Sequence, residues 1–139
     1  MSEFTFIILK PETVGRGLIG QIISRIEGKG FKIKAMKYLK ASLSDAEKLY
    51  AVHVGKSFYP ELIAHITSGP IVPMVVEAPD AVVGVRKLIG ATDPQHAEPG
   101  TIRRDFGLSV TKNAIHAADS PENAVKEMSI FFSPQDIVE

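Results

Sequence analysis

The fold class follows from one stretch of sequence, Ile71-Val72-Pro73-Met74-Val75-Val76-Glu77-Ala78, which begins directly after the chain break Gly69-Pro70. A short apolar run that is bounded by turn residues is typical of a central strand whose two faces are both buried. Such a strand requires neighbouring strands and covering helices, and the segments on either side of it predict both.

The residues before this strand predict two more strands and three helices. Residues 4–9 are aromatic and β-branched and end at a proline, which predicts a strand. Apolar residues at helical spacing in residues 18–28 predict a helix that is preceded by a loop. Residues 31–43 alternate between apolar and polar side chains, which predicts a long second strand with one solvated face. The Ser-x-x-Glu pattern of residues 44–47 predicts a capped helix, and a short helix is expected over residues 60–67.

The residues after the central strand predict a helix and then a long loop. Asp80 can cap a helix over residues 81–89, and Gly90 can end it. Residues 91–111 contain several prolines and glycines without a clear period. A loop of this length in a compact domain is often functional.

A short strand and a helix end the chain. Residues 113–116 predict the strand, and Ser120-Pro121 predicts the helix start, with an inner face of Ala124, Met128 and Phe131 or Phe132. The element order β-α-β-α-α-β-α-β-α predicts the α+β class, as a ferredoxin-like (βαββαβ) sandwich with a four-stranded antiparallel sheet flanked by helices. Because the chain has 139 residues, we expect a single domain over residues 1–139.

Composition excludes several classes of function. Sixteen Lys and Arg residues balance sixteen Asp and Glu residues, so no global field favours nucleic acid or an anionic membrane. Cysteine is absent, which excludes disulfides, thiolate metal sites and cysteine nucleophiles. The N-terminus has no basic leader, and no apolar run approaches the roughly 18 residues of a membrane span. We therefore expect a cytoplasmic protein with no membrane and no nucleic-acid partner.

One glycine motif resembles a dinucleotide-binding fingerprint, but its context in the sequence does not support that function. Residues 15–20 match Gly-x-Gly-x-x-Gly, but these glycines do not follow the first strand directly. The next strand offers Met36, Lys37 and Lys40 where a ribose-binding acid is expected. We interpret the glycines as easing the loop into the following helix. A phosphate-binding P-loop pattern is absent as well.

His116 is the candidate nucleophile among the four histidines. The other three, His53, His65 and His96, lack metal-binding spacing and are interpreted as solvated or hydrogen-bonded. A histidine nucleophile needs one neutral nitrogen, so its other nitrogen requires a partner that fixes the tautomer, and a carboxylate suits that role. Glu127 lies on the last helix, where a tight turn can return it to His116. From residue types alone, a structural histidine near a helix start is the more common alternative.

Basic side chains fall where they can serve a phosphate site. Lys10 ends the first strand, Arg86 lies on the helix before the long loop, and Arg103 and Arg104 lie on that loop with Thr92. The arginine guanidinium binds phosphate oxygens in pairs, and phosphoryl transfer depends mainly on positioning and charge neutralisation. If these side chains converge in the fold, they would bind a triphosphate. Scattered basic residues are more often simply solvated.

An ordered set of motifs spans nearly the whole chain and resembles the nucleoside diphosphate kinase family. These motifs are Thr5-Phe6-Ile7-Ile8-Leu9-Lys10-Pro11, Arg16-Gly17-Leu18-Ile19-Gly20, Ser68-Gly69-Pro70, Pro99-Gly100-Thr101-Ile102-Arg103 with Asp105-Phe106, and Asn113-Ala114-Ile115-His116 with Asp119-Ser120. The last two are very specific in combination. The fold of the family is ferredoxin-like, as the element order predicts independently.

The resemblance implies a ping-pong exchange between nucleoside triphosphates and diphosphates. His116 would accept the γ-phosphoryl group and pass it to a second nucleotide, with Glu127 orienting its ring and Tyr50 helping to position it. Mg²⁺ would bridge the phosphates and would be held through them rather than by protein ligands. The chain would also form a homo-oligomer, either a hexamer or a tetramer.

The resemblance also implies which residues bind the nucleotide. Lys10 and Asn113 would bond the ribose hydroxyls and nearby phosphate oxygens, and three further residues would hold the phosphates. The base would stack on one side chain and touch another, which explains broad substrate use because stacking reads no base edge. The phosphate-binding residues and the two base contacts are, respectively, Arg86, Thr92 and Arg103, and Phe58 and Val110.

Two departures from the family pattern bear on activity. Ala118 stands where the family usually has serine, so a hydroxyl near Glu127 is missing and the rate would fall. Ser57-Phe58-Tyr59 replaces the usual proline-phenylalanine-phenylalanine but keeps the stacking ring. The alternative function is a non-catalytic ferredoxin-like nucleotide-binding module, and an inactive protein with a structural role is a third.

Overall fold

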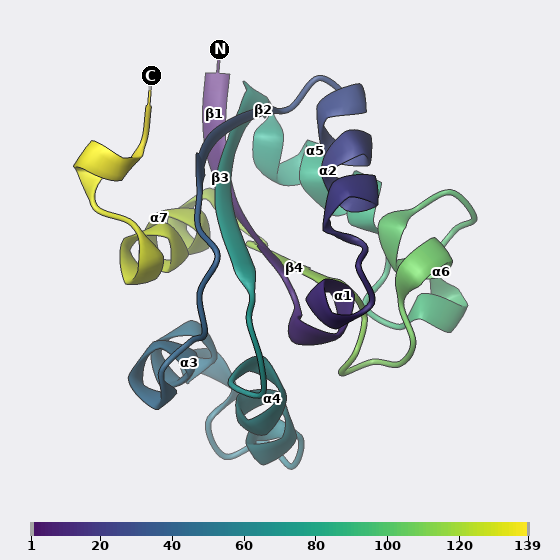
Figure 1. The fold of residues 1–139 in the computed structure, drawn as a ribbon, viewed down its shortest axis with the longest axis vertical. Helices are drawn as coiled ribbons and strands as arrows, with labels where there is room; N and C mark the ends of the chain where they lie inside the picture. The colour runs from purple at the N-terminus through teal and green to yellow at the C-terminus, as the bar shows by residue number, and fades with distance from the viewer. Residues whose placement is uncertain (1, 139) are drawn as a thin grey trace.

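The computed structural model describes residues 2–138 and contains one four-stranded antiparallel sheet with the strand order β2-β3-β1-β4 (Figure 1). The strands are β1 (Ser2–Leu9), β2 (Lys32–Met36), β3 (Val72–Pro79) and β4 (Ile115–Ala117). This order and the crossing helices confirm the predicted ferredoxin-like sandwich. The predicted central strand is β3, in which residues 72–76 are all buried.

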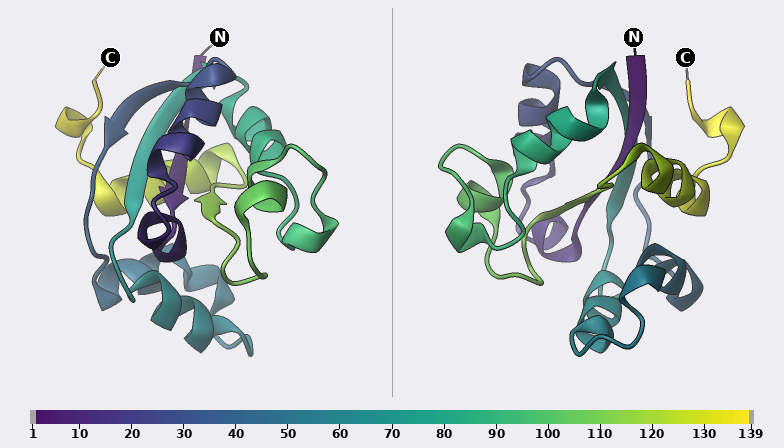
Figure 2. Two further views of the ribbon diagram at one scale, coloured as in Figure 1. Left: turned by 45° about the vertical axis from the view of Figure 1, so that its right-hand side comes forward. Right: turned by 180° about the vertical axis from the view of Figure 1, so that it is seen from behind.

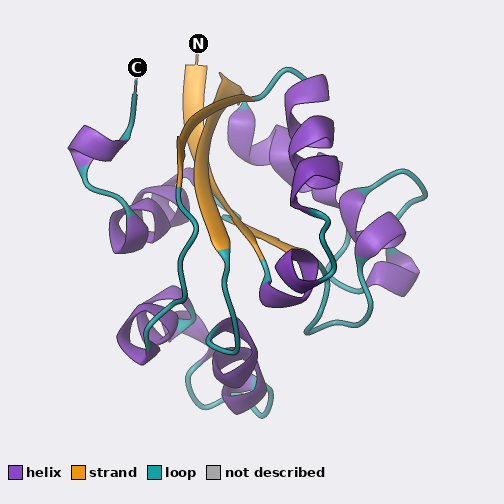
Figure 3. Ribbon diagram, in the orientation of Figure 1, coloured by secondary structure: helices purple, strands orange, loops and turns teal. Residues whose placement is uncertain are grey.

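Among the described residues, seven α-helices surround the sheet, with short 3₁₀ turns at Ala51–His53, Pro94–His96 and Pro134–Asp136 (Figure 3). Figure 2 shows α2 and α5 on one face of the sheet and α7 on the other, while α3 and α4 lie together at one end. The helices are α1 (Pro11–Gly15), α2 (Ile19–Gly28), α3 (Leu43–Leu49), α4 (Tyr59–Ile66), α5 (Ala81–Ile89), α6 (Ile102–Phe106) and α7 (Pro121–Phe131).

Alternation along β1 divides the core into two clusters. Ile7 and Leu9 pack toward α2 and α5, whereas Phe6 and Ile8 pack toward α3, α4 and α7. Successive side chains of a strand point to opposite faces, so one strand feeds both clusters. His116 pairs with Ile8 in the β4–β1 ladder, and its neighbours Ile115 and Ala117 belong to the α2/α5 cluster. Its side chain therefore points to the face that α7 covers.

The predicted long strand over residues 31–43 is wrong, because β2 ends at Met36. Pro73 supplies the reason. Lys37 donates its backbone N–H to the Pro73 carbonyl at 3.0 Å, but proline has no N–H to return a ladder bond. A register shift between Ile33 and Ala35 also bends the strand, and beyond it only the isolated bridge between Leu39 and Ile71 remains.

The helix caps depart from expectation at two places. The capping box is formed by Ser42 and Asp45 rather than by residues 44–47, so α3 begins earlier than predicted. Asp80 precedes α5 as expected, but it adopts a left-handed backbone with φ 51° and makes no side-chain cap bond. Instead, Glu3 accepts the Val82 N–H at 2.8 Å from across the sheet.

Two segments predicted as loops contain helix. Residues 11–15 form α1, because Pro11 occupies the first turn of a helix, where its missing N–H costs nothing. Residues 91–111 include a 3₁₀ turn and α6, which Thr101 caps by accepting the Arg104 N–H. Within residues 2–138, no helix has the length and apolar character needed to cross a membrane.

Candidate active site

One pocket of about 670 Å³ lies between α3, α4, α7 and the residues before β4. All ten residues that the sequence analysis assigned to catalysis or nucleotide binding line it. They come from every part of the chain: Lys10, Tyr50, Phe58, Arg86, Thr92, Arg103, Val110, Asn113, His116 and Glu127.

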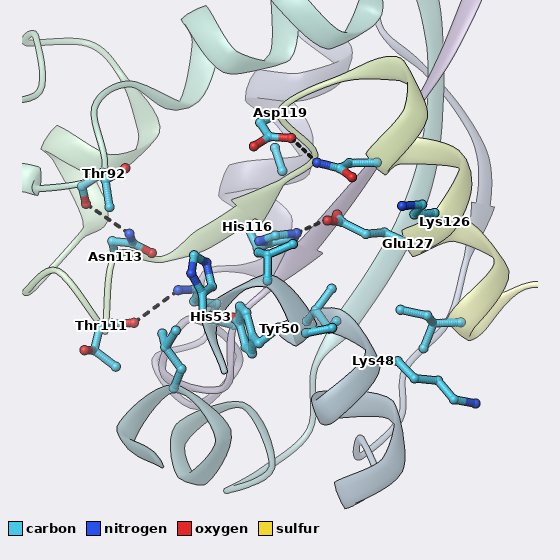
Figure 4. Close-up of a pocket in the computed structure, with 18 of the residues that line it drawn as sticks. Lys48, Tyr50, His53, Thr92, Thr111, Asn113, His116, Asp119, Lys126 and Glu127 are labelled. Carbon is cyan, nitrogen blue, oxygen red and sulfur yellow. Dashed lines mark hydrogen bonds and ion pairs between the residues drawn. The ribbon is translucent and has the colours of Figure 1, made fainter. Parts of the chain in front are cut away.

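His116 and Glu127 form the centre of this pocket (Figure 4). The His116 Nε2 lies 2.7 Å from the Glu127 Oε1, and both side chains are largely buried. The turn that brings them together is fixed by Ser120, whose hydroxyl accepts the Asn123 N–H and so begins α7. Because a carboxylate can only accept a hydrogen bond, the Nε2 carries a proton, and in the neutral imidazole the Nδ1 then keeps its lone pair.

Aromatic rings hold His116 from two sides. Tyr50, which ends α3, contacts it edge-on with ring centroids 6.1 Å apart, and Phe6 does so at 6.3 Å. Burial, with the nearby carboxylates of Glu127 and Glu12, raises the pKa of Tyr50 well above its usual value. Tyr50 therefore stays a neutral phenol at physiological pH.

Two exposed apolar side chains lie at the mouth of the pocket. Phe58 at the start of α4 and Val110 before β4 line the pocket and are 42% and 54% exposed. His53, in the 3₁₀ turn, contacts Phe58 with ring centroids 5.3 Å apart. An exposed aromatic ring at a pocket mouth suits a planar ligand.

Lys10 lies at the base of the pocket and is 5% exposed. Its Nζ donates to the Thr111 carbonyl at 3.1 Å. Burial lowers the pKa of Lys10 to about 8; Glu12 opposes this shift, and the Arg103 charge adds to it. Desolvation disfavours the ammonium form, and an anionic ligand beside it would raise the pKa back toward its usual value.

Arg86 and Arg103 both line this pocket. Arg103 donates to the Gly90 carbonyl at 3.1 Å and to the Ile115 carbonyl at 2.9 Å, which ties α6 to β4. Burial, and then the nearby Arg86 charge, lower the pKa of Arg103, although guanidinium groups keep their proton at neutral pH. Arg86 donates to the Ala117 carbonyl at 3.3 Å.

Two buried polar atoms of pocket residues have no hydrogen-bond partner within residues 2–138. They are the Arg103 Nε and the Asn113 Oδ1, whereas the Asn113 amide nitrogen donates to the Thr92 carbonyl at 3.0 Å. Buried polar groups are nearly always paired, so such atoms need an explanation. A polar ligand in the pocket would satisfy them.

Sequence reasoning missed several pocket residues, among them His53 and Asp119. His53 was interpreted as solvated or hydrogen-bonded, yet it lines the pocket, where burial and the charges of Lys56 and His116 lower its pKa against the opposing charge of Asp119. Asp119 also lines the pocket and accepts a hydrogen bond from Asn123 at 2.6 Å. The signal for His53 was its spacing of three residues from Tyr50.

Ala118, which stands where the family usually has serine, is buried, and its N–H donates to the Phe6 carbonyl.

Comparison with known proteins identifies the family of this chain. The sequence model of the nucleoside diphosphate kinase family matches residues 3–137. A nucleoside diphosphate kinase of Metallosphaera sedula is 56% identical over 138 residues, which is 99% of each chain. A second relative, from Ignicoccus hospitalis, is 56% identical over 99% of this chain and 93% of its own.

Solved structures with a similar fold are also nucleoside diphosphate kinases. The nucleoside diphosphate kinase of Aquifex aeolicus has a TM-score of 0.96 and 42% identity over 99% of this chain and 100% of that one. A halophilic enzyme from Halobacterium salinarum, solved in complex with CDP, also has a TM-score of 0.96 and 42% identity, over 100% of this chain and 93% of that one. These matches favour an enzyme over a non-catalytic nucleotide-binding module. The chain belongs to the nucleoside diphosphate kinase family, which transfers the γ-phosphoryl group of a nucleoside triphosphate to a nucleoside diphosphate.

Proposed function

We propose that His116 is the residue that carries the phosphoryl group between the two nucleotides. The observation that supports this role is the 2.7 Å contact between its Nε2 and the Glu127 carboxylate. That contact leaves the Nδ1 as the free nucleophilic nitrogen. A general base is unnecessary, because the attacking nitrogen is already neutral.

The first half-reaction forms one bond and breaks one. The Nδ1 lone pair attacks the γ-phosphorus, and the bond from that phosphorus to the bridging oxygen breaks, so the nucleoside diphosphate leaves with the electron pair. The ring then bears a positive charge, which the Glu127 carboxylate stabilises across the Nε2 hydrogen bond. The second nucleotide reverses these steps with its own terminal oxygen.

Lys10, Arg86, Arg103 and Thr92 would hold the phosphates. This role is supported by their position, because three cationic side chains from three segments of the chain line one pocket together with His116. Phosphoryl transfer relies on positioned positive charge more than on covalent chemistry. Within residues 2–138, no group of three or more His, Asp or Glu side chains is placed to bind a metal ion. Enzymes of this family use divalent metal, and we propose Mg²⁺ bound through the nucleotide phosphates, whose charge it would reduce.

Phe58, Val110 and Asn113 would bind the nucleoside. The exposed Phe58 ring and the Val110 side chain lie at the pocket mouth, where they can contact the two faces of a base without reading its edge. The unpaired Asn113 Oδ1 can accept from a ribose hydroxyl, and Lys10 can donate to one. This arrangement predicts similar activity with purine and pyrimidine nucleotides.

Labelling with γ-³²P-ATP tests the carrier role. We expect one acid-labile, base-stable label per chain, which is lost when unlabelled GDP is added and appears as labelled GTP. An unlabelled protein that still exchanges phosphate would contradict the phosphohistidine route, because direct transfer between two bound nucleotides needs no covalent intermediate.

Glu127→Gln is expected to slow turnover by on the order of 10²-fold. The glutamine amide can donate to Nε2 and so favour the unproductive tautomer, and it cannot balance the positive ring. Presteady-state measurement of the labelling rate isolates this step. Glu122→Gln, an exposed change on the same helix, is the matched control and should label at the wild-type rate. A Glu127→Gln rate close to wild type would rule out the orienting role.

The pH profile of kcat/KM should report Lys10. Because its pKa is lowered to about 8, the free enzyme holds this charge below that pH and loses it above. We therefore expect kcat/KM for nucleoside triphosphates to fall as the pH rises through about 8. Lys10→Arg, which stays charged, should start lower but remain flat over the same interval. If both proteins showed the same fall, another group would be responsible.

We also infer that the chain forms a homo-oligomer, either a hexamer or a tetramer. Exposed apolar side chains on and beside the edge strand β2, namely Met36 and Tyr38, support association. Light scattering measures the mass directly. A cytoplasmic location stays a prediction from the sequence.

A further inference from the structure

Ala114 has a backbone that alanine rarely adopts, two residues before His116. Its φ is 79°, in the left-handed region that favours glycine. Residues 10–13 hold Ala114 by three hydrogen bonds. The Glu12 Oε2 accepts the Ala114 N–H at 2.8 Å, and the Ala114 carbonyl accepts from the Thr13 hydroxyl at 2.7 Å and from the Lys10 N–H at 3.1 Å.

The second oxygen of Glu12 is held by a histidine that the catalytic mechanism leaves unused. The His65 Nε2 lies 2.7 Å from the Glu12 Oε1, and the two side chains are only 12% and 8% exposed. Burial by itself would raise the pKa of Glu12, but the hydrogen bonds from His65 and from the Ala114 N–H outweigh it, and the pKa lies below its usual value. Glu12 is therefore ionised, with both oxygens in use.

This pair connects the two sides of the pocket. His65 belongs to α4, which begins directly after Phe58 at the pocket mouth, and Glu12 belongs to α1, directly after Lys10 and Pro11. Ala114 lies between Asn113 and the strand that carries His116. The bonds of Glu12 thus run from the helix behind the base-binding ring to the backbone that sets the position of the nucleophile.

We propose that Glu12 and His65 are positioning residues that hold the segment from Asn113 to His116 in its reactive arrangement. The proposal rests on the role of His116 argued above. A backbone held in a sparsely populated conformation persists only while its surroundings fix it, and such strain occurs where geometry matters. Without the carboxylate, the Ala114 N–H would lose its acceptor and the chain would relax toward negative φ. The His116 Nδ1 would then move away from the line of attack.

His65 has its effect through Glu12. If its N–H donor is removed, a buried carboxylate oxygen lacks a partner, so Glu12 turns toward water or binds a proton. Either change releases Ala114. Misplacement of a reacting group by about 1 Å can cost on the order of 10²-fold in rate. We therefore expect a lower kcat, with little change in KM because Arg86, Thr92 and Arg103, which are proposed to hold the phosphates, lie outside the segment from Asn113 to His116.

Three variants of the pair test this. Glu12→Leu and His65→Leu remove the hydrogen-bonding groups and should each lower kcat by about 10- to 100-fold, with KM for ATP within about twofold of wild type. His65→Gln keeps an N–H donor and should recover most of the lost kcat. Equal losses in His65→Leu and His65→Gln, or a loss confined to KM, would overturn the proposal.

Controls separate positioning from loss of stability and from failure of the proposed function. Glu61→Gln, an exposed change on α4, should match wild type. Ile26→Ala, in the α2/α5 core and away from the pocket, should lower the melting temperature while leaving kcat of the folded protein unchanged. A drop in kcat for Ile26→Ala as large as for His65→Leu would also overturn the proposal. The pair variants should still acquire the ³²P label, only more slowly, whereas unlabelled wild type would contradict the role of His116 itself.

Discussion

His116→Ala is expected to lower turnover by on the order of 10⁵-fold and to abolish ³²P labelling of the protein. Alanine removes the nitrogen that forms the bond to phosphorus, and a water molecule in its place is a much weaker nucleophile. The remaining pocket should still bind nucleotides, because the phosphate and base contacts come from other residues. Calorimetric titration with ADP should therefore give a dissociation constant within a few fold of wild type.

His96→Ala is the matched control for that variant. The His96 side chain is 79% exposed and lies in the segment after α5, so its loss should change neither labelling nor turnover. His53→Ala is informative as well, because His53 lines the same pocket. If His53→Ala lost the label and His116→Ala kept it, the assignment of the nucleophile would be wrong.

Arg103→Lys should lower kcat/KM by on the order of 10³-fold while leaving the fold intact. Lysine keeps a positive charge, but it cannot reproduce a planar fork that bonds two backbone carbonyls while a further N–H remains for phosphate. The loss of one buried carbonyl partner should cost about 1–3 kcal/mol of stability. Steady-state kinetics and a thermal melt separate the two effects.

Arg104→Lys is the control for Arg103→Lys. Arg104 is the next residue on α6, but it is exposed and donates to the Gln95 carbonyl rather than toward the pocket. We expect kcat/KM within about twofold of wild type for this variant. Equal losses in both variants would assign the effect to the helix rather than to the buried guanidinium.

Local patterns predicted most elements of the fold but not all of their ends. The helix over residues 81–89 and the apolar strand after Gly69-Pro70 were predicted to within a residue at each end, because apolar periodicity and turn residues are local. The length of β2 was not, because it depends on Pro73, a residue of the partner strand. Alternation indicates which face a side chain takes, but it does not show where the partner stops donating hydrogen bonds.

The candidate site was predicted by motif order rather than by local chemistry. Residue types made His116 the candidate nucleophile but left a structural histidine as the more common alternative, and the resemblance decided between the two. In the structure, the Glu127 carboxylate lies 2.7 Å from the His116 ring, and His53 and Asp119 also line the pocket. The spacing of the site residues, from Lys10 to Glu127, exceeds any local pattern.

The sequence by itself determined the order of the four strands and of five of the helices, the fold class and the family, because periodicity, turn residues and motifs are properties of neighbouring residues. Only the tertiary structure decided that Glu12 bonds both His65 and Ala114, since these partners lie 53 and 102 residues away from it. The antiparallel neighbours β1 and β4 bring the two ends of the chain together, and the packing of α1 and α4 closes the contact. No sequence pattern specifies such contacts, because they depend on the free energy of the whole packed chain.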